Sequence, residues 1–348
     1  MFEQKTDIRL LPETPPQLIV VIDTEEEFDW SAEPDAKANR VSAMAHIDRA
    51  QTIFNEYGIC PCYVIDYPVA SQPRGYGLLR QFAEKGQCEI GAHLHPWVNP
   101  PQEEVLSRSN MYPGNLPEAL EREKLRVLRD TIQQNFGQAP VAYKAGRYGF
   151  GPNTTGILQE LGFNIDLSVC PPLDSREDGG PDYRRFDAHP FWFGGSDKPI
   201  LEVPCTGGFI GWAQPMAIPL FETAQRLRKF KAPGILSRLG AVDRLMLSPE
   251  GYTPAEHIKL TKALYKQGVR TFTWSFHSPS VVPGNTTYVQ NEAQLKAFLD
   301  SFRQFFDFFF NELGGQASSL PAFASIWRVW HEGARDIPAR QGFNGLNR

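Results

Sequence analysis

The sequence predicts an α/β protein built on a parallel β-sheet of roughly seven strands, either open or closed into a barrel. Short apolar, β-branched segments alternate with helical segments along most of the chain, as in parallel sheets covered by helices. Polar side chains directly follow five of the predicted strands. Because functional groups of such folds collect at the carboxyl ends of the strands, the same pattern predicts an active site there.

The predicted strands are short and rich in Val, Ile, Leu or aromatic residues. The first, at residues 18–22, reads LIVVI and has no polar side chain, which is typical of a strand buried on both faces. The others are expected at residues 60–65, 87–91, 141–144, 163–167, 199–203 and 269–276.

The predicted helices lie between these strands and have recognisable ends. Gly58, Gly137 and Gly162 follow three of them, where glycine commonly terminates a helix. Thr253 and Glu256 form a capping box around Pro254 at the first helical position. We expect helices at residues 43–57, 75–85, 115–136, 153–161 and 254–267, and a last one with an apolar stripe between residues 295 and 309.

A length of 348 residues allows one large domain or two modest ones. No linker separates two sets of strands and helices. We therefore expect a single domain at residues 18–315 with an insertion around residues 171–252. An N-terminal extension at residues 1–17 and a C-terminal tail at residues 316–348 complete the chain.

Composition narrows the function classes. Hydrophobic residues make up 41% of the chain and charged residues 22%, with a formal net charge of −5. A mildly acidic chain has no general attraction to nucleic acid, so no nucleic-acid partner is expected. No apolar run reaches the ~18 residues of a membrane span, and the N-terminus lacks a signal-peptide core. We expect a cytoplasmic protein, and the sequence predicts no oligomeric state.

His93 and His95 are the sharpest chemical signal. They end the third predicted strand, where residues two apart point to the same side. Two imidazoles on one side suit Zn²⁺ or another divalent ion that prefers nitrogen. The alternative is a pair of satisfied structural histidines.

An acidic run, DTEEEFD, follows the first strand, and a carboxylate from it is the expected third ligand. Asp23 and Glu25 are two apart, so one could bind metal while the other acts as a general base. Glu26 is the alternative ligand if the segment turns instead of staying extended. A solvated acidic loop is the non-functional interpretation.

Three further strand ends carry Arg147, Asp166 and His277. His277 is a candidate general acid because imidazole titrates near neutral pH. Arg147 could hold Asp23 ionised, and Asp166 could orient His277. Structural ion pairs or loop caps are the alternatives for both of these residues.

These five stations, in this order, resemble the polysaccharide deacetylase family with the NodB-homology domain. The resemblance covers roughly residues 18–312, and EIGAHLHPW and WSFHSPS are its most specific parts. It implies a deformed (β/α) barrel of about seven parallel strands with loop insertions. It also implies one divalent metal, with Zn²⁺ favoured. The implied ligands are Glu25, His93 and His95, and the implied catalytic residues are Asp23, Arg147, Asp166 and His277.

The resemblance implies hydrolysis of an acyl amide, acetyl above all, on a sugar or glycan precursor, possibly in surface-polysaccharide synthesis. Two spacings depart from the family. Thr24 separates the two acids, which are usually adjacent, and the histidines are two apart, where the family usually has four. A small cyclic amide as substrate, or an inactive carbohydrate-binding protein, are the alternatives. Strand–helix alternation argues against an all-β dioxygenase with an HxH motif.

Overall fold

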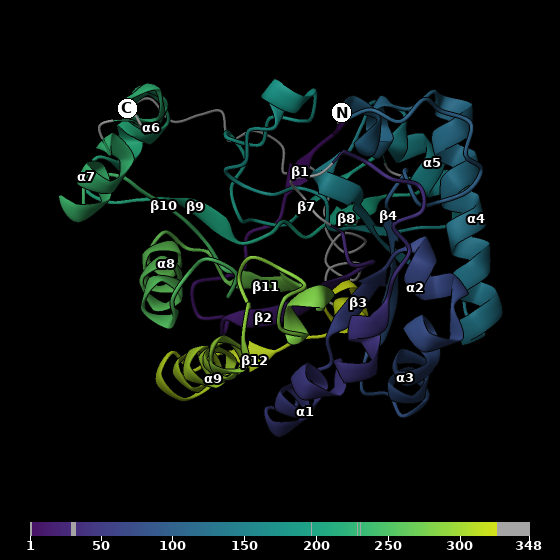
Figure 1. The fold of residues 1–348 in the computed structure, drawn as a ribbon. Helices are drawn as coiled ribbons and strands as arrows, with labels where there is room; N and C mark the ends of the chain where they lie inside the picture. The colour runs from purple at the N-terminus through teal and green to yellow at the C-terminus, as the bar shows by residue number, and fades with distance from the viewer. Residues whose placement is uncertain (1, 29–32, 196, 228, 230, 326–348) are drawn as a thin grey trace, which may run out of the picture.

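A large mixed β-sheet organises the chain (Figure 1). The computed structural model describes residues 2–28, 33–195, 197–227, 229 and 231–325. Within this part the sheet has ten strands in the order β1-β7-β8-β6-β5-β4-β3-β2-β11, with β12 also paired to β2. The strands are β1 (Thr6–Asp7), β2 (Gln17–Thr24), β3 (Cys62–Ile65), β4 (Glu89–Leu94), β5 (Ala142–Ala145), β6 (Ile165–Asp166), β7 (Phe191–Phe193), β8 (Ile200–Glu202), β11 (Thr271–His277) and β12 (Gln316–Ala317).

Parallel pairing runs from β11 through β2, β3, β4, β5 and β6 to β8, so the predicted parallel sheet is confirmed. The sheet is mixed and larger than expected, because β1 and β7 pair antiparallel and β12 adds a short strand. These additions are two or three residues long. Strands that short carry too little periodicity to be recognised from sequence.

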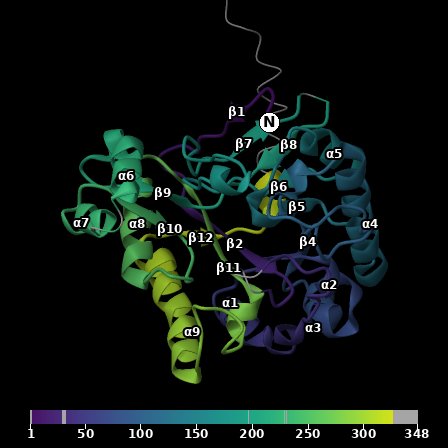
Figure 2. The same cartoon turned by 45° about the horizontal axis from the view of Figure 1, so that its top comes forward.

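Helices cover the outer face of the sheet (Figures 1 and 2). They are α1 (Asp48–Glu56), α2 (Tyr67–Ser71), α3 (Pro73–Glu84), α4 (Glu118–Phe136), α5 (Thr154–Leu161), α8 (Pro254–Lys266) and α9 (Glu292–Asp307). The predicted capping box at Thr253 is present at the start of α8. Among the described helices, none is long and apolar enough to cross a membrane.

The two faces of the sheet are separated by strand periodicity. On β2, Leu18, Val20 and Ile22 pack under the helices, whereas Ile19 and Val21 point to the inner face. The inner face is filled by apolar side chains from neighbouring strands and by Leu320 and Phe323, which follow β12. The packed interior below leaves only the carboxyl ends of the strands open to a ligand.

The region around residues 171–252 is only partly an insertion. It contributes β7 and β8 to the main sheet and then forms a separate ribbon of β9 (Gly207–Ile210) and β10 (Asp243–Met246). Between these two strands lie α6 (Ala217–Arg226) and α7 (Ala232–Arg238), which the sequence did not predict. The N-terminal extension supplies β1 and the tail supplies β12, while residues 326–348 of the tail lie outside the described part. The domain boundaries stay a prediction.

Candidate active site

Strand periodicity brings four of the functional side chains to one mouth. Asp23 continues the inner-face series of Ile19 and Val21 on β2. His277 ends β11 on the face opposite Phe276, and its backbone is paired with that of Asp23. His93 on β4 lies between Ala92 and Leu94, which point outward, so it faces inward. Lys144 on β5 is in phase with the inward Ala142.

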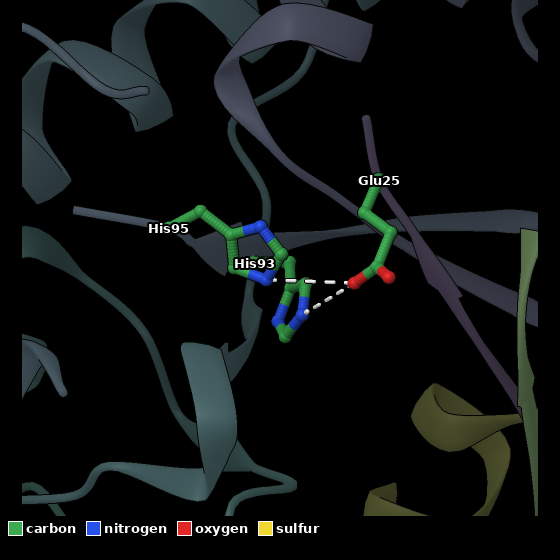
Figure 3. Close-up of side chains that lie close together, drawn as sticks. All are labelled: Glu25, His93 and His95. Atoms are coloured by element: carbon green, nitrogen blue, oxygen red, sulfur yellow. Dashed lines mark ion pairs between the residues drawn. The ribbon is translucent and has the colours of Figure 1, made fainter. Parts of the chain in front are cut away.

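Glu25, His93 and His95 form a compact, buried group (Figure 3). The Glu25 Oε2 atom lies 3.6 Å from His93 Nε2 and 3.4 Å from His95 Nε2. One possible ligand atom from each residue lies within 4.8 Å of the others. The same Glu25 oxygen is buried and makes no hydrogen bond to any described residue. Two imidazole nitrogens and one carboxylate oxygen are a donor set that suits a divalent transition metal.

Outer partners orient both imidazoles. His93 Nδ1 lies 3.0 Å from the carbonyl oxygen of Lys144, and His95 Nδ1 lies 2.9 Å from Glu26 Oε2. In both rings the Nε2 atom therefore faces Glu25, as expected of metal-binding histidines with hydrogen-bonded Nδ1 atoms. Burial lowers the pKa of both residues, that of His95 to about 4, which keeps the rings neutral and able to bind a metal.

Glu26 has a different environment from Glu25. Its carboxylate accepts a hydrogen bond from Trp97 Nε1 at 2.8 Å as well as contacting His95. Glu26, Asp66 and His95 form a second group of potential ligand atoms. However, burial and the neighbouring Glu26 raise the pKa of Asp66 well above its usual range, so this group is held together by shared protons. The geometry favours Glu25 as the ligand and Glu26 as the group that orients His95.

Asp23 forms a buried ion pair with a residue that the sequence did not single out. Lys144 Nζ lies 2.6 and 2.7 Å from the two carboxylate oxygens of Asp23. Burial alone would raise the pKa of Asp23, but the charges of Lys144, His93 and His277 lower it overall. Asp23 is therefore ionised at neutral pH and can accept a proton.

Arg147 does not contact Asp23, contrary to the expectation from sequence. Its guanidinium donates to Asp178 at 2.9 Å and lies over the Tyr112 ring at 4.6 Å. Arg147 and Tyr148 have left-handed backbone angles (φ 52° and 61°), which turn the chain away from the inner face directly after β5. Arg147 lines the open mouth, and Lys144, three residues earlier on the strand, takes the place beside Asp23.

Gly146 explains why this turn sits so close to the histidines. A Cβ atom at this position would lie 2.3 Å from the Leu94 carbonyl oxygen and 2.8 Å from His95 Cδ2. Only glycine allows the chain after β5 to pack against the end of β4.

Asp166 does not contact His277 either, and strand phase gives the reason. Ile165 and Leu167 belong to the inner face, so the Asp166 side chain points to the opposite face. There it accepts a hydrogen bond from Ser168 Oγ at 2.6 Å and pairs with Glu202. Burial raises the pKa of both carboxyls, that of Asp166 to about 6 and that of Glu202 further, so Glu202 retains a proton. The pair braces β6 against β8.

Glu250 occupies the place expected for Asp166. Its Oε2 atom lies 2.6 Å from His277 Nδ1, and its other oxygen accepts from the Ser280 hydroxyl. The second ring nitrogen of His277, Nε2, lies 3.6 Å from Asp23 Oδ2. Burial would lower the pKa of His277, but the carboxylates of Glu250, Glu25 and Asp23 raise it to about 10. His277 is thus a cation at neutral pH.

The signals for the two missed residues differ. Lys144 is a charged residue in the otherwise apolar strand VAYKA, and that contrast could have identified it. Glu250 lies in a turn, SPEG, far from any predicted strand, and nothing in its local sequence indicates a site.

These groups open into a cavity of about 270 Å³. Tyrosines provide its apolar walls, whereas two tryptophans considered from sequence do not line it. Trp97 is buried beneath His95, with ring centres 4.2 Å apart, and Trp274 packs against Phe302 of α9. The lining residues are Asp23, Glu25, His93, Tyr112, Ala145, Arg147, Tyr148, Leu173, Ser175, Glu250, His277, Thr286 and Tyr288.

Comparison with known proteins supports the fold. No protein-family model and no curated protein sequence matches the chain significantly. Among solved structures, a "putative polysaccharide deacetylase" from Mycobacterium smegmatis is similar over 99% of this chain and 100% of its own length, with a TM-score of 0.53 and 14% identity. The PuuE allantoinase is similar over 93% of this chain and 91% of its own, with a TM-score of 0.53 and 16% identity.

At these identities the likeness concerns the fold. It confirms the predicted architecture in its coarser form, a mostly parallel, curled sheet covered by helices. The chain therefore has a fold of the NodB-homology type that polysaccharide deacetylases and PuuE allantoinase share.

Proposed function

We propose that the chain is a metal-dependent hydrolase that removes an acyl group, acetyl in the first place, from an amide nitrogen of a sugar or glycan precursor. The observation that carries this proposal is the arrangement of Asp23 and His277 beside the Glu25–His93–His95 group. Their facing atoms are 3.6 Å apart, and each has its own buried ionic partner. One side chain is prepared to accept a proton and the other to donate one.

A divalent metal held by Glu25, His93 and His95, with Zn²⁺ favoured, would polarise the acyl carbonyl and lower the pKa of water in the site. Asp23 then takes a proton from the water that attacks the amide carbon. His277 donates a proton from Nε2 to the amide nitrogen as the C–N bond breaks. The products are a carboxylic acid and a free amine, so one water is consumed and the atoms balance.

The remaining polar groups act through these residues. Lys144 holds Asp23 ionised and fixes its direction. Glu250 holds His277 protonated and turns Nε2 towards Asp23. Arg147 lines the cavity and is proposed to position substrate, while Asp166 supports the strand ends from the outer face. A cytoplasmic location stays a prediction.

A second candidate function is hydrolysis of a small cyclic amide. Its support is the fold likeness to PuuE allantoinase. The cavity, at about 270 Å³, is near the lower end of the ~300–1,000 Å³ usual for small-molecule sites. Such a reaction uses the same base and acid but opens a ring and releases no separate carboxylic acid.

The proposal is tested by metal analysis combined with an amine-release assay. We expect the purified protein to bind about one divalent metal per chain and to release amine from free or nucleotide-linked N-acetyl sugars. A chelator should remove both the metal and the activity, and added Zn²⁺ should restore them. A cyclic amide opened in place of any N-acetyl sugar would favour the second function. A protein without metal would contradict both.

Glu250→Gln is expected to change the pH dependence of turnover. Glu250 helps to raise the pKa of His277 to about 10, so its loss should bring that pKa down towards the ordinary value. Because His277 must be protonated to donate, the alkaline limit of kcat should move to lower pH by at least about one unit. Asp166→Asn is the matched control, since this buried carboxyl lies on the other face. An unchanged alkaline limit in Glu250→Gln would exclude His277 as the acid.

A further inference from the structure

Exposed apolar side chains concentrate on the unit formed by β9, α6, α7 and β10. Of nine large hydrophobic residues exposed in the described part of the chain, five lie between residues 212 and 239. Scattered exposed apolar residues are ordinary, but a concentration of them marks an interaction surface. The exposed fractions are 76% for Trp212, 66% for Leu239, 61% for Met216, 51% for Ile235 and 46% for Leu227.

Three of these residues lie together, and we call Trp212, Ile235 and Leu239 the apolar tip. Trp212 Nε1 donates to the carbonyl oxygen of Leu239 at 3.2 Å. Ile235 lies one turn before Leu239 on α7, and residues four apart share a helix face. In both views α6 and α7 project from one end of the molecule, away from α1–α5 (Figures 1 and 2).

The same segment is strongly basic. Residues 212–239 contain five basic side chains and one acidic one, a formal charge of +4, in a chain whose net charge is −5. Arg226, Lys229, Lys231 and Arg238 are exposed. The acidic residue, Glu222, pairs with Arg184 outside the segment.

We propose that this unit docks on an anionic lipid membrane surface. Short helices with apolar side chains beside Lys and Arg lie in the headgroup region of bilayers, and tryptophan favours that interface. The basic side chains would face anionic headgroups, each contributing roughly fivefold in affinity. A second copy of this chain fits the unit less well, because a two-fold contact would bring two +4 segments together.

Docking would place the active-site mouth near the bilayer. The unit begins at Gly207, where a Cβ atom would lie 2.1 Å from the Pro171 carbonyl oxygen, so it packs directly on the following loop. Leu173 and Ser175 of that loop line the active-site cavity. If the proposed function holds, this position suits a sugar substrate carried on a lipid. Membrane docking itself does not depend on the proposed function.

Vesicle flotation tests the proposal without an activity assay. We expect the full chain to bind phosphatidylcholine vesicles that contain phosphatidylglycerol, to bind pure phosphatidylcholine much less, and to be released by salt. Lys229→Gln with Lys231→Gln should weaken binding about 30-fold. Trp212→Ala with Leu239→Ala should also weaken it, including at higher salt.

Matched controls remove the same groups elsewhere. Leu11→Ala with Val105→Ala removes exposed apolar side chains, and Lys37→Gln with Lys85→Gln removes two exposed charges. Both pairs should leave vesicle binding unchanged. Absence of binding to phosphatidylglycerol vesicles at low salt would overturn the proposal. So would tip variants that only convert a dimer to a monomer, because the patch would then be a contact between copies.

Discussion

Asp23→Asn is expected to lower kcat by about 10²- to 10⁴-fold while the metal content stays unchanged. Asparagine keeps the shape of aspartate but cannot accept a proton from water. Because Glu25, His93 and His95 are left intact, the proposed metal ligands remain. Amine release measures the first effect, and elemental analysis of the purified variant measures the second.

The ion pair with Lys144 requires a control on stability. Asp23→Asn leaves a buried ammonium without a counter-charge, which typically costs about 3–5 kcal/mol. Lys144→Met in the same chain removes that charge. The double variant should recover much of the thermal stability but none of the turnover. If Asp23→Asn lost the metal while Glu25→Gln kept it, the two acids would have exchanged roles.

His95→Ala is expected to abolish metal binding and, with it, turnover. His95 is fully buried and supplies one of the two nitrogen ligands in the proposed set. Its loss should weaken metal binding by more than the about 10- to 100-fold that follows loss of an outer-sphere partner. Competition with a chromophoric chelator measures the dissociation constant directly.

Two variants make this result specific. Glu26→Gln alters only the group that orients His95 Nδ1, so we expect an intermediate loss of about 10- to 100-fold. His257→Ala removes another fully buried histidine, whose Nε2 lies 2.7 Å from the Ser248 carbonyl oxygen and which is not in the metal group. Metal affinity should be unchanged there. Equal losses in all three variants would mean that metal binding reports only on folding.

Local sequence was most informative where one short segment contains the whole signal. The buried strands, the capping box at Thr253 and the His93–His95 pair all depend on spacings of a few residues. Their geometry follows from helix and strand periodicity alone. The short strands β1, β7 and β12 gave no such signal, because their stability comes from pairing with distant strands.

The assignment of partners depended on distant contacts. From sequence, Arg147 and Asp166 were the expected partners of Asp23 and His277, because both follow strands of the same sheet. The structure gives those places to Lys144 and Glu250 instead. For Asp166 the difference is one residue of phase, which reverses the face to which a side chain points. For Glu250 it is a turn 27 residues before His277 that only the fold brings into contact.

The sequence by itself determined that polar side chains stand at the ends of buried parallel strands, since hydrophobic periodicity decides which segments become strands and where they end. It therefore also determined that Asp23, Glu25, His93, His95 and His277 share one mouth. Only the tertiary structure decided which charges pair there. A buried charge is stabilised by a partner within a few ångströms, and such distances are set by strand phase and by loops from remote parts of the chain.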